Sequence, residues 1–243
     1  MQAAKRDIIS QLQTDLLKLQ GYKQTVRNTA LDTGLGEIIN AFPNATFPIG
    51  CVHEFLSATK EDKASTTGFI AGLLRALTDN NGAALWVSSS RTLFPPALKN
   101  FGINPERVVF VDVTKEQDIL WVMDEALKCG ALHAVVAEIR ELSFMNSRRL
   151  QLAVEQSQVT GFVLRTDLHK ISTTACVSRW RITSLPGELL DDLPGVSFPK
   201  WNVELLRIRN GKPGSWNVTW KTSRFHVEPV VHRTHQPFIQ QAG

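Results

Sequence analysis

The clearest chemical pattern in this sequence lies between Cys51 and Leu74, where a strand, a polar loop and a helix are predicted in succession. The apolar run 51–56 predicts a buried strand, residues 57–63 predict a loop, and apolar side chains from Phe69 onward recur at helical spacing. In this arrangement backbone N–H groups and the positive end of a helix bind phosphate groups. The chemistry to consider is therefore the binding and hydrolysis of a nucleoside triphosphate.

The loop lacks the side chains that this chemistry requires. A phosphate-binding loop needs glycine for close approach of its backbone, a lysine for the β- and γ-phosphates and a hydroxyl for Mg²⁺. Residues 57–67 contain no glycine, and Ala64 and Ser65 stand where glycine and lysine are needed. Glu61 and Asp62 add negative charge where a polyanion would bind. We predict that the chain has no ATPase activity and carries no cofactor.

A nucleotide hydrolase also needs a metal-binding acid, a glutamate that activates water and a polar sensor. The apolar strand 134–137 ends in Glu138, but the strand 85–87 is followed by serines, and a later strand ends in Arg165 and Thr166. With only one such carboxylate, a structural salt bridge or a solvated strand end is favoured over a metal role for Glu138. The histidines near the C-terminus match no usual zinc spacing, so no metal site is predicted.

Basic and aromatic residues alternate in the second half of the chain. Arg165, Lys170, Arg179 and Arg181 form a candidate basic patch, and four tryptophans between residues 180 and 220 lie among similar charges. This combination suits nucleic acid, because bases stack on aromatic rings. The favoured alternative places the tryptophans in the core and the arginines in water, which the alternation of a half-buried sheet fits equally well.

The bulk composition limits the class of protein. The chain has 243 residues, 43% hydrophobic and 21% charged, which is enough for one α/β domain and argues against wholesale disorder. Its net charge of +4 permits contact with nucleic acid without requiring it. Three widely spaced cysteines suit a reducing compartment, and no long apolar run indicates a signal peptide or membrane span. A cytoplasmic protein without membrane contact is expected.

Short apolar strands alternate with helices from residue 49 to residue 165, which predicts an α/β fold with a mainly parallel sheet and helices on both faces. Later strands are expected at 177–182, 201–209 and 216–221, and turn residues join the last two into an antiparallel hairpin. We divide the chain into four segments: an N-terminal amphipathic helix (1–21), a linker (22–48), a main domain (49–221) and a C-terminal tail (222–243).

The N-terminal segment carries an apolar stripe of Ile8, Leu12, Leu16 and Leu19. An exposed apolar stripe normally marks an interface, and a helix laid in a groove of its partner is a common form of it. Packing of the stripe on the main domain fits the sequence equally well.

Several stretches resemble RecA-type domains. Residues Phe47–Leu56 resemble their opening strand, and Ala126–Glu138 resemble the helix and strand that carry the metal-binding acid. A more specific resemblance, over about residues 31–221, is to the ImuA family, RecA-like accessory proteins of bacterial mutagenic repair. It rests on the order and spacing of Ser147–Ala153, Thr160–Arg165, Arg179–Arg181 and Trp201–Trp220.

The resemblance to RecA assigns positions to a remnant of a nucleotide site. The run Ala64-Ser65-Thr66-Thr67 takes the place of Gly-Lys-Thr-Thr, so Ser65 replaces the phosphate lysine. Ser90 stands at the position of the catalytic glutamate, Glu138 at that of the metal-binding aspartate and Thr166 at that of the sensor glutamine. The resemblance thus implies a RecA-like core that neither hydrolyses ATP nor makes filament contacts with single-stranded DNA.

The function that the resemblance implies is that of a non-catalytic RecA-like adaptor in damage-induced translesion synthesis. Its partners would be an ImuB-like protein of the Y-family type, RecA or an error-prone DnaE-type polymerase. A weak DNA contact and self-association stay open. From a different class, a SulA-like inhibitor of cell division in the SOS response is the alternative, because that group is also RecA-related and lacks a phosphate loop.

Overall fold

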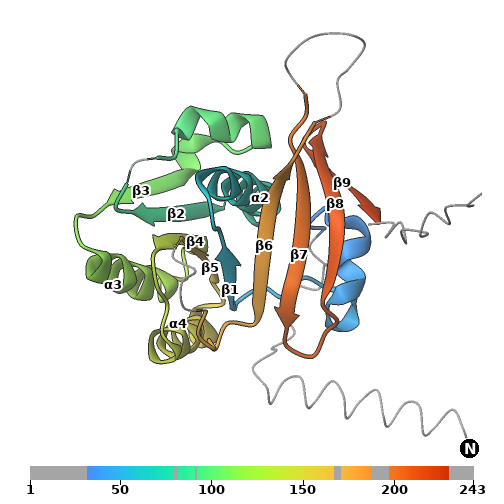
Figure 1. The fold of residues 1–243 in the computed structure, drawn as a ribbon. Coiled ribbons are helices and arrows are strands. Elements are labelled where there is room, and N and C mark those ends of the chain that lie inside the picture. Colours follow the sequence, from blue (N-terminus) through green and yellow to red (C-terminus); the bar gives the residue numbers. More distant parts are fainter. Residues whose placement is uncertain (1–31, 79–81, 91, 167–170, 188–196, 230–243) are drawn as a thin grey trace, which may run out of the picture.

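The computed structural model describes residues 32–78, 82–90, 92–166, 171–187 and 197–229. Its centre is a nine-stranded sheet in the order β3-β2-β4-β5-β1-β6-β7-β8-β9 (Figure 1). The strands are Val52–Leu56 (β1), Ala83–Ser88 (β2), Val108–Asp112 (β3), Leu132–Ile139 (β4), Thr160–Arg165 (β5), Ser178–Leu185 (β6), Lys200–Ile208 (β7), Gly214–Lys221 (β8) and Arg224–Pro229 (β9). The helices are Lys60–Thr78 (α2), Glu116–Leu127 (α3) and Phe144–Ser157 (α4), with 3-10 turns at Gly36–Ala41 (η1), Pro43–Ala45 (η2), Pro95–Phe101 (η3) and Pro105–Arg107 (η4).

Strands β1 to β6 form the parallel half of the sheet, in which β1 lies between β5 and β6. Successive side chains of a strand point to opposite faces. Trp86 and Val136 pack on the face that α2 covers, whereas Val87 and Val135 pack on the face that α3 and α4 cover. Both faces of the parallel strands are therefore apolar and covered, and the predicted α/β fold is confirmed.

Strands β6 to β9 run antiparallel to one another, which confirms the predicted extension. The turn between β7 and β8 includes Asn210 at a φ of 58°, a left-handed conformation that asparagine tolerates. Strand β9 comes from the stretch that the sequence assigned to the tail. In β9, Phe225 and Val227 face the core and alternate with the polar Arg224, His226 and Glu228. This alternation covers only six residues, so it is a weak strand signal in the sequence.

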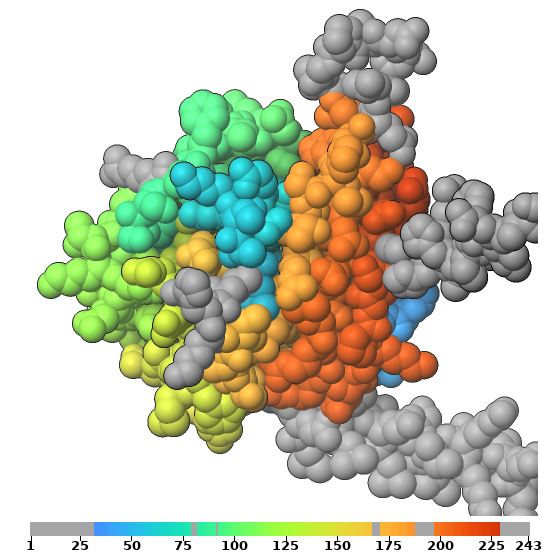
Figure 2. Space-filling view, viewed as in Figure 1, coloured from blue at the N-terminus to red at the C-terminus, as the bar shows by residue number. Residues whose placement is uncertain are grey.

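Helix α2 packs against the aromatic side chains of the antiparallel half. Trp180, Trp201 and Trp220 are at most 5% exposed, and they share one core cluster with Phe225. Gly72 of α2 gives these rings room, because a Cβ atom at this position would lie 2.3 Å from Cζ of Phe225. These tryptophans are core residues, as the favoured alternative predicted. On the molecular surface, the exposed residues of α2 lie between those of β2–β3 and those of β6 (Figure 2).

Residues 35–47 pack into the core, although they fall within the predicted linker 22–48. Leu35, Ile38 and Phe47 are at most 2% exposed and belong to the cluster around α2. Glycine and proline interrupt this stretch, so its apolar residues show no regular period in the sequence. The compact unit thus extends beyond the predicted boundaries 49 and 221 on both sides. The predicted N-terminal helix and residues 230–243 lie outside the described residues.

Candidate functional site

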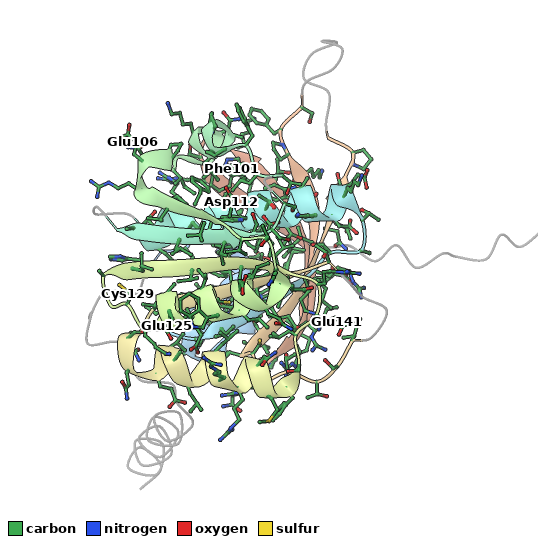
Figure 3. All side chains as sticks on the ribbon, turned by 90° about the vertical axis from the view of Figure 1, so that its left-hand side faces the viewer. Phe101, Glu106, Asp112, Glu125, Cys129 and Glu141 are labelled. Carbon is green, nitrogen blue, oxygen red and sulfur yellow. The ribbon has the colours of Figure 1, made fainter. Side chains whose placement is uncertain are left out.

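The residues of the predicted nucleotide site lie where the parallel strands end. Arg165 of β5 is in register with Leu56 of β1 and with Ile139 of β4. Glu138 and Thr166 therefore lie at one edge of the sheet, and the N–H of Thr166 donates to the carbonyl of Ile139 at 3.1 Å. We call this edge the carboxyl edge. In Figure 3 it lies toward Glu141, which follows β4, and away from Cys129, which precedes it.

The connection from β1 to α2 is shorter than the sequence predicted. A loop was expected over residues 57–63, but α2 begins at Lys60, which leaves three residues between strand and helix. The stretch Ala64–Thr67 lies inside the helix, where Ser65 and Thr66 are buried. The hydroxyl of Thr66 lies 3.0 Å from that of Ser57, so it contributes to packing of the helix against the strand end.

The start of α2 is capped by its own side chains. Thr59 Oγ1 accepts a hydrogen bond from the N–H of Asp62 at 3.1 Å, and Asp62 Oδ2 accepts one from the N–H of Thr59 at 3.3 Å. This reciprocal capping box explains why the helix begins earlier than predicted. Hydrogen bonds from its own N–H and from Thr59 lower the pKa of Glu61, so the first turn carries negative charge. Both the occupied N–H groups and the charge oppose phosphate binding.

Lys63 reaches from the first turns of α2 to the carboxyl edge. Its Nζ lies 2.7 Å from Oε2 of Glu138, 3.0 Å from Oγ1 of Thr92 and 3.4 Å from Oγ of Ser90. The other carboxylate oxygen of Glu138 accepts a hydrogen bond from Nε1 of Trp86 at 2.8 Å. The structure thus brings Ser90 and Glu138 together around a lysine, and Glu138 forms an ion pair with Lys63.

Cys176 precedes β6 and lies beside the start of β1, away from the carboxyl edge. Burial raises the pKa of the Cys176 thiol to about 12, which keeps it protonated and unreactive. Among the described residues, no three His, Cys, Asp or Glu side chains gather as a metal site. No helix in the described part of the chain has the length and apolarity to cross a membrane.

The candidate basic patch is not a surface feature at Arg165. The Arg165 side chain is fully buried, and its Nη1 lies 2.8 Å from Oε1 of Glu54. Nε of Arg179 lies 2.7 Å from the second oxygen, Oε2, which also accepts a hydrogen bond from Thr174 at 2.9 Å. A buried carboxylate requires such partners, so these two arginines neutralise Glu54 instead of facing a nucleic acid.

The other arginines near this cluster also have structural partners. Nη2 of Arg207 donates to the carbonyls of Thr174 at 3.1 Å and Cys176 at 2.8 Å, and burial together with the nearby Arg179 lowers the pKa of Arg207. Nη1 of Arg181 lies 3.6 Å from Oε2 of Glu204, with a side chain 40% exposed. Arg181 is thus the member of the predicted patch that faces solvent, and Lys170 lies outside the described residues.

Sequence reasoning missed Glu54. The signal was present, because a carboxylate within the apolar run Val52–Leu56 must find a cation when the strand is buried. Its partners are more than a hundred positions away, so only the parallel order of β5, β1 and β6 identifies them. The predicted interface residues Ile8, Leu12, Leu16 and Leu19 lie outside the described residues.

The chain is similar in sequence to curated proteins. ImuA of Caulobacter vibrioides, known from two strains, is 35% identical over 198 residues, which cover 76% of this chain and 81% of the relative. The chain belongs to the ImuA family.

One solved structure is also similar, at a lower level. SulA from Pseudomonas aeruginosa is 22% identical, with a TM-score of 0.41, over 47% of this chain and 97% of SulA. Similarity at this level carries no argument for the cell-division alternative. No protein-family model matches the chain.

Proposed function

We propose that this member of the ImuA family is a non-catalytic, RecA-like adaptor in a damage-induced translesion synthesis complex. It acts in the cytoplasm through protein–protein contacts with an ImuB-like protein, RecA or an error-prone DnaE-type polymerase. The observation that carries the proposal is the occupation of the carboxyl edge by the chain itself. Thr59 and Asp62 occupy each other's N–H groups at the start of α2, and Lys63 neutralises Glu138.

The first test concerns the nucleotide. The contacts that a phosphate lysine and glycine N–H groups supply are absent from the sequence of the loop, and charge-assisted contacts of this kind contribute about 1.5–3 kcal/mol each. We expect an ATP dissociation constant weaker than about 1 mM by calorimetry, and no turnover. Binding in the micromolar range, or turnover that Glu138→Ala abolishes, would contradict an adaptor without nucleotide chemistry.

The second test concerns the biological role. A strain that lacks the gene should lose damage-induced mutagenesis, and the wild-type gene should restore it. Glu138→Gln should restore it equally well, because the proposed role requires no metal-bound nucleotide at this residue. A null phenotype for Glu138→Gln, with normal protein levels, would favour an ATPase instead.

The third test concerns the partner interface, for which we propose the stripe Ile8, Leu12, Leu16 and Leu19. The double variant Leu12→Asp with Leu16→Asp should lose binding to the purified ImuB-like protein, RecA or polymerase from the same organism. Ser10→Asp with Thr14→Asp adds the same charge on the opposite side of a helix and serves as control. Unchanged melting with lost binding supports the interface. Unfolding assigns the stripe to the core, and retained binding places the interface elsewhere.

A further inference from the structure

The ammonium group of Lys63 occupies a site lined by oxygen atoms. A carboxylate oxygen of Glu138 and the hydroxyls of Thr92 and Ser90 lie 2.7, 3.0 and 3.4 Å from Nζ. The Glu138 side chain is 5% exposed, and that of Lys63 is 20% exposed. Three oxygens from β4 and from the segment after β2 therefore surround one cation that α2 supplies.

We propose that this is a cation site which the chain fills with its own lysine, so that the carboxyl edge keeps one conformation without any bound ligand. The inference rests on the proposed function, because a platform independent of nucleotide needs some other way to neutralise Glu138. The lysine ties the start of α2 to the end of β4 and to the segment after β2. In effect, a tethered ammonium stands where a hard cation of the divalent class would bind.

The chemistry of the lining supports this assignment. Carboxylate and hydroxyl oxygens are ligands that hard divalent cations accept, and a nearly buried carboxylate is costly without a counter-charge. Oε1 of Glu138 already accepts the N–H of Trp86, so Oε2 is the oxygen left for a cation. Lys63 supplies that cation, with Nζ 2.7 Å from Oε2.

A second role for Lys63 must be separated from this one. Lys63 lies two positions before Ser65, so it could be a relocated lysine for a phosphate group. The geometry opposes this role, because Asp62 is adjacent and the capping box leaves no free loop around a phosphate. The two roles predict different effects of removing the lysine. If Lys63 fills a cation site, its removal should increase metal binding; if it binds phosphate, its removal should weaken nucleotide binding.

The experiment compares the full-length protein with Lys63→Ala and with the double variant Lys63→Ala, Glu138→Gln. The probe is terbium(III), whose luminescence a nearby tryptophan sensitises, and Trp86 is hydrogen-bonded to the carboxylate in question. Competition with manganese(II) then gives the affinity for a divalent ion. We expect Lys63→Ala to bind the metal about tenfold or more tightly than the wild type, and the double variant to lose this gain.

Each other outcome overturns the inference. Equal metal binding by the wild type and Lys63→Ala shows that the lysine does not occupy a cation site. A gain that survives Glu138→Gln shows that the metal binds elsewhere. ATP binding by the wild type that Lys63→Ala abolishes shows a relocated phosphate lysine. If Lys63→Ala melts too early for titration, Lys63→Ser replaces it, because a short polar side chain vacates the same site.

The same proteins distinguish failure of this inference from failure of the proposed function. Binding of the wild-type protein to the ImuB-like protein, RecA or polymerase tests the adaptor role and does not depend on terbium. If the wild type binds its partner but Lys63→Ala shows no vacant cation site, only the cation inference is contradicted. If Lys63→Ala shows a vacant cation site but the wild type binds no partner, only the adaptor role is contradicted.

Discussion

Two buried glutamates on parallel strands are neutralised in different ways. Glu54 of β1 is fully buried, and both of its oxygens contact arginines, Arg165 and Arg179, that come from the neighbouring strands β5 and β6. Glu138 of β4 is 6% exposed, and a single lysine reaches it from the surface. The Glu54 cluster thus lies inside the sheet, whereas the Glu138 pair lies at its carboxyl edge.

The difference separates charges inside the sheet from charges at its carboxyl edge, where we propose the remnant of a nucleotide site. Strand β6 is where the parallel half meets the antiparallel half, and the Glu54 cluster joins β5, β1 and β6 on the parallel side of this junction. Removing Glu54 takes a carboxylate from two arginines, of which Arg165 is out of reach of water. The Glu138 pair joins α2 to the sheet edge, and Lys63 can turn toward water if its partner is lost, because its side chain is 20% exposed.

The largest expected effect is that of Glu54→Gln. The substitution keeps the shape of the side chain but removes the charged carboxylate that the buried Arg165 and Arg179 contact, and breaking a buried pair in this way costs about 3–5 kcal/mol. Denaturant titration should therefore show a large fall in the free energy of unfolding. Glu204→Gln is the control, since Glu204 and its partner Arg181 are both partly exposed to solvent and such a pair contributes about 0–1 kcal/mol. Equal losses for the two variants would disprove a structural role specific to Glu54.

His53, next to Glu54 on β1, makes stability depend on pH. Its ring lies between Phe47 and Phe162, at centroid distances of 4.7 and 5.6 Å. Its nitrogens lie 2.6 Å from Oγ of Ser178 and 2.8 Å from the carbonyl of Pro48. Burial lowers the pKa of His53 from 6.5 to about 4, against the opposing effect of the Pro48 carbonyl.

The sign of this effect follows from proton binding. Between pH 6.5 and about 4 the unfolded chain holds a proton on this histidine and the folded chain does not. The contribution of His53 to the free energy of unfolding is fully present above pH 6.5. It is lost as the pH falls toward 4, and the total loss is about 3 kcal/mol. Denaturant titrations at several pH values should show this slope. His53→Gln should flatten it, and the exposed His226→Gln should leave it unchanged. A slope that persists in His53→Gln would assign it to other groups.

The sequence was sufficient to predict the fold class, because the strands of the parallel half are continuous apolar runs between helices. The helix start was predicted too late because Thr59 and Asp62 were taken as loop residues, although their spacing is that of a capping box. A local rule could have corrected this boundary.

Other errors required the three-dimensional structure. Arg165 and Arg179 looked like surface charges because Glu54, their counter-ion, lies more than a hundred positions away in the sequence. The apolar residues of 35–47 have no period, so nothing local indicates that they pack on α2. A salt bridge of Glu138 was one of two structural roles expected from the sequence, but its partner Lys63 was not foreseen, since Lys63 was assigned to a loop.

The smallest expected effect is that of Glu138→Gln, which applies the same chemical change to the second glutamate. The glutamine oxygen still accepts the N–H of Trp86, and the freed Lys63 can move into water, so the free energy of unfolding should fall by about 1 kcal/mol or less. Added salt should reduce the difference from the wild type further, because salt screens the charge of Lys63, the more exposed member of the pair. Denaturant titrations at low and high salt, run beside Glu54→Gln, give the ratio of the two losses. A loss at Glu138 as large as that at Glu54, and insensitive to salt, would mean that the carboxyl edge is as much a part of the folding core as the junction of the two sheet halves.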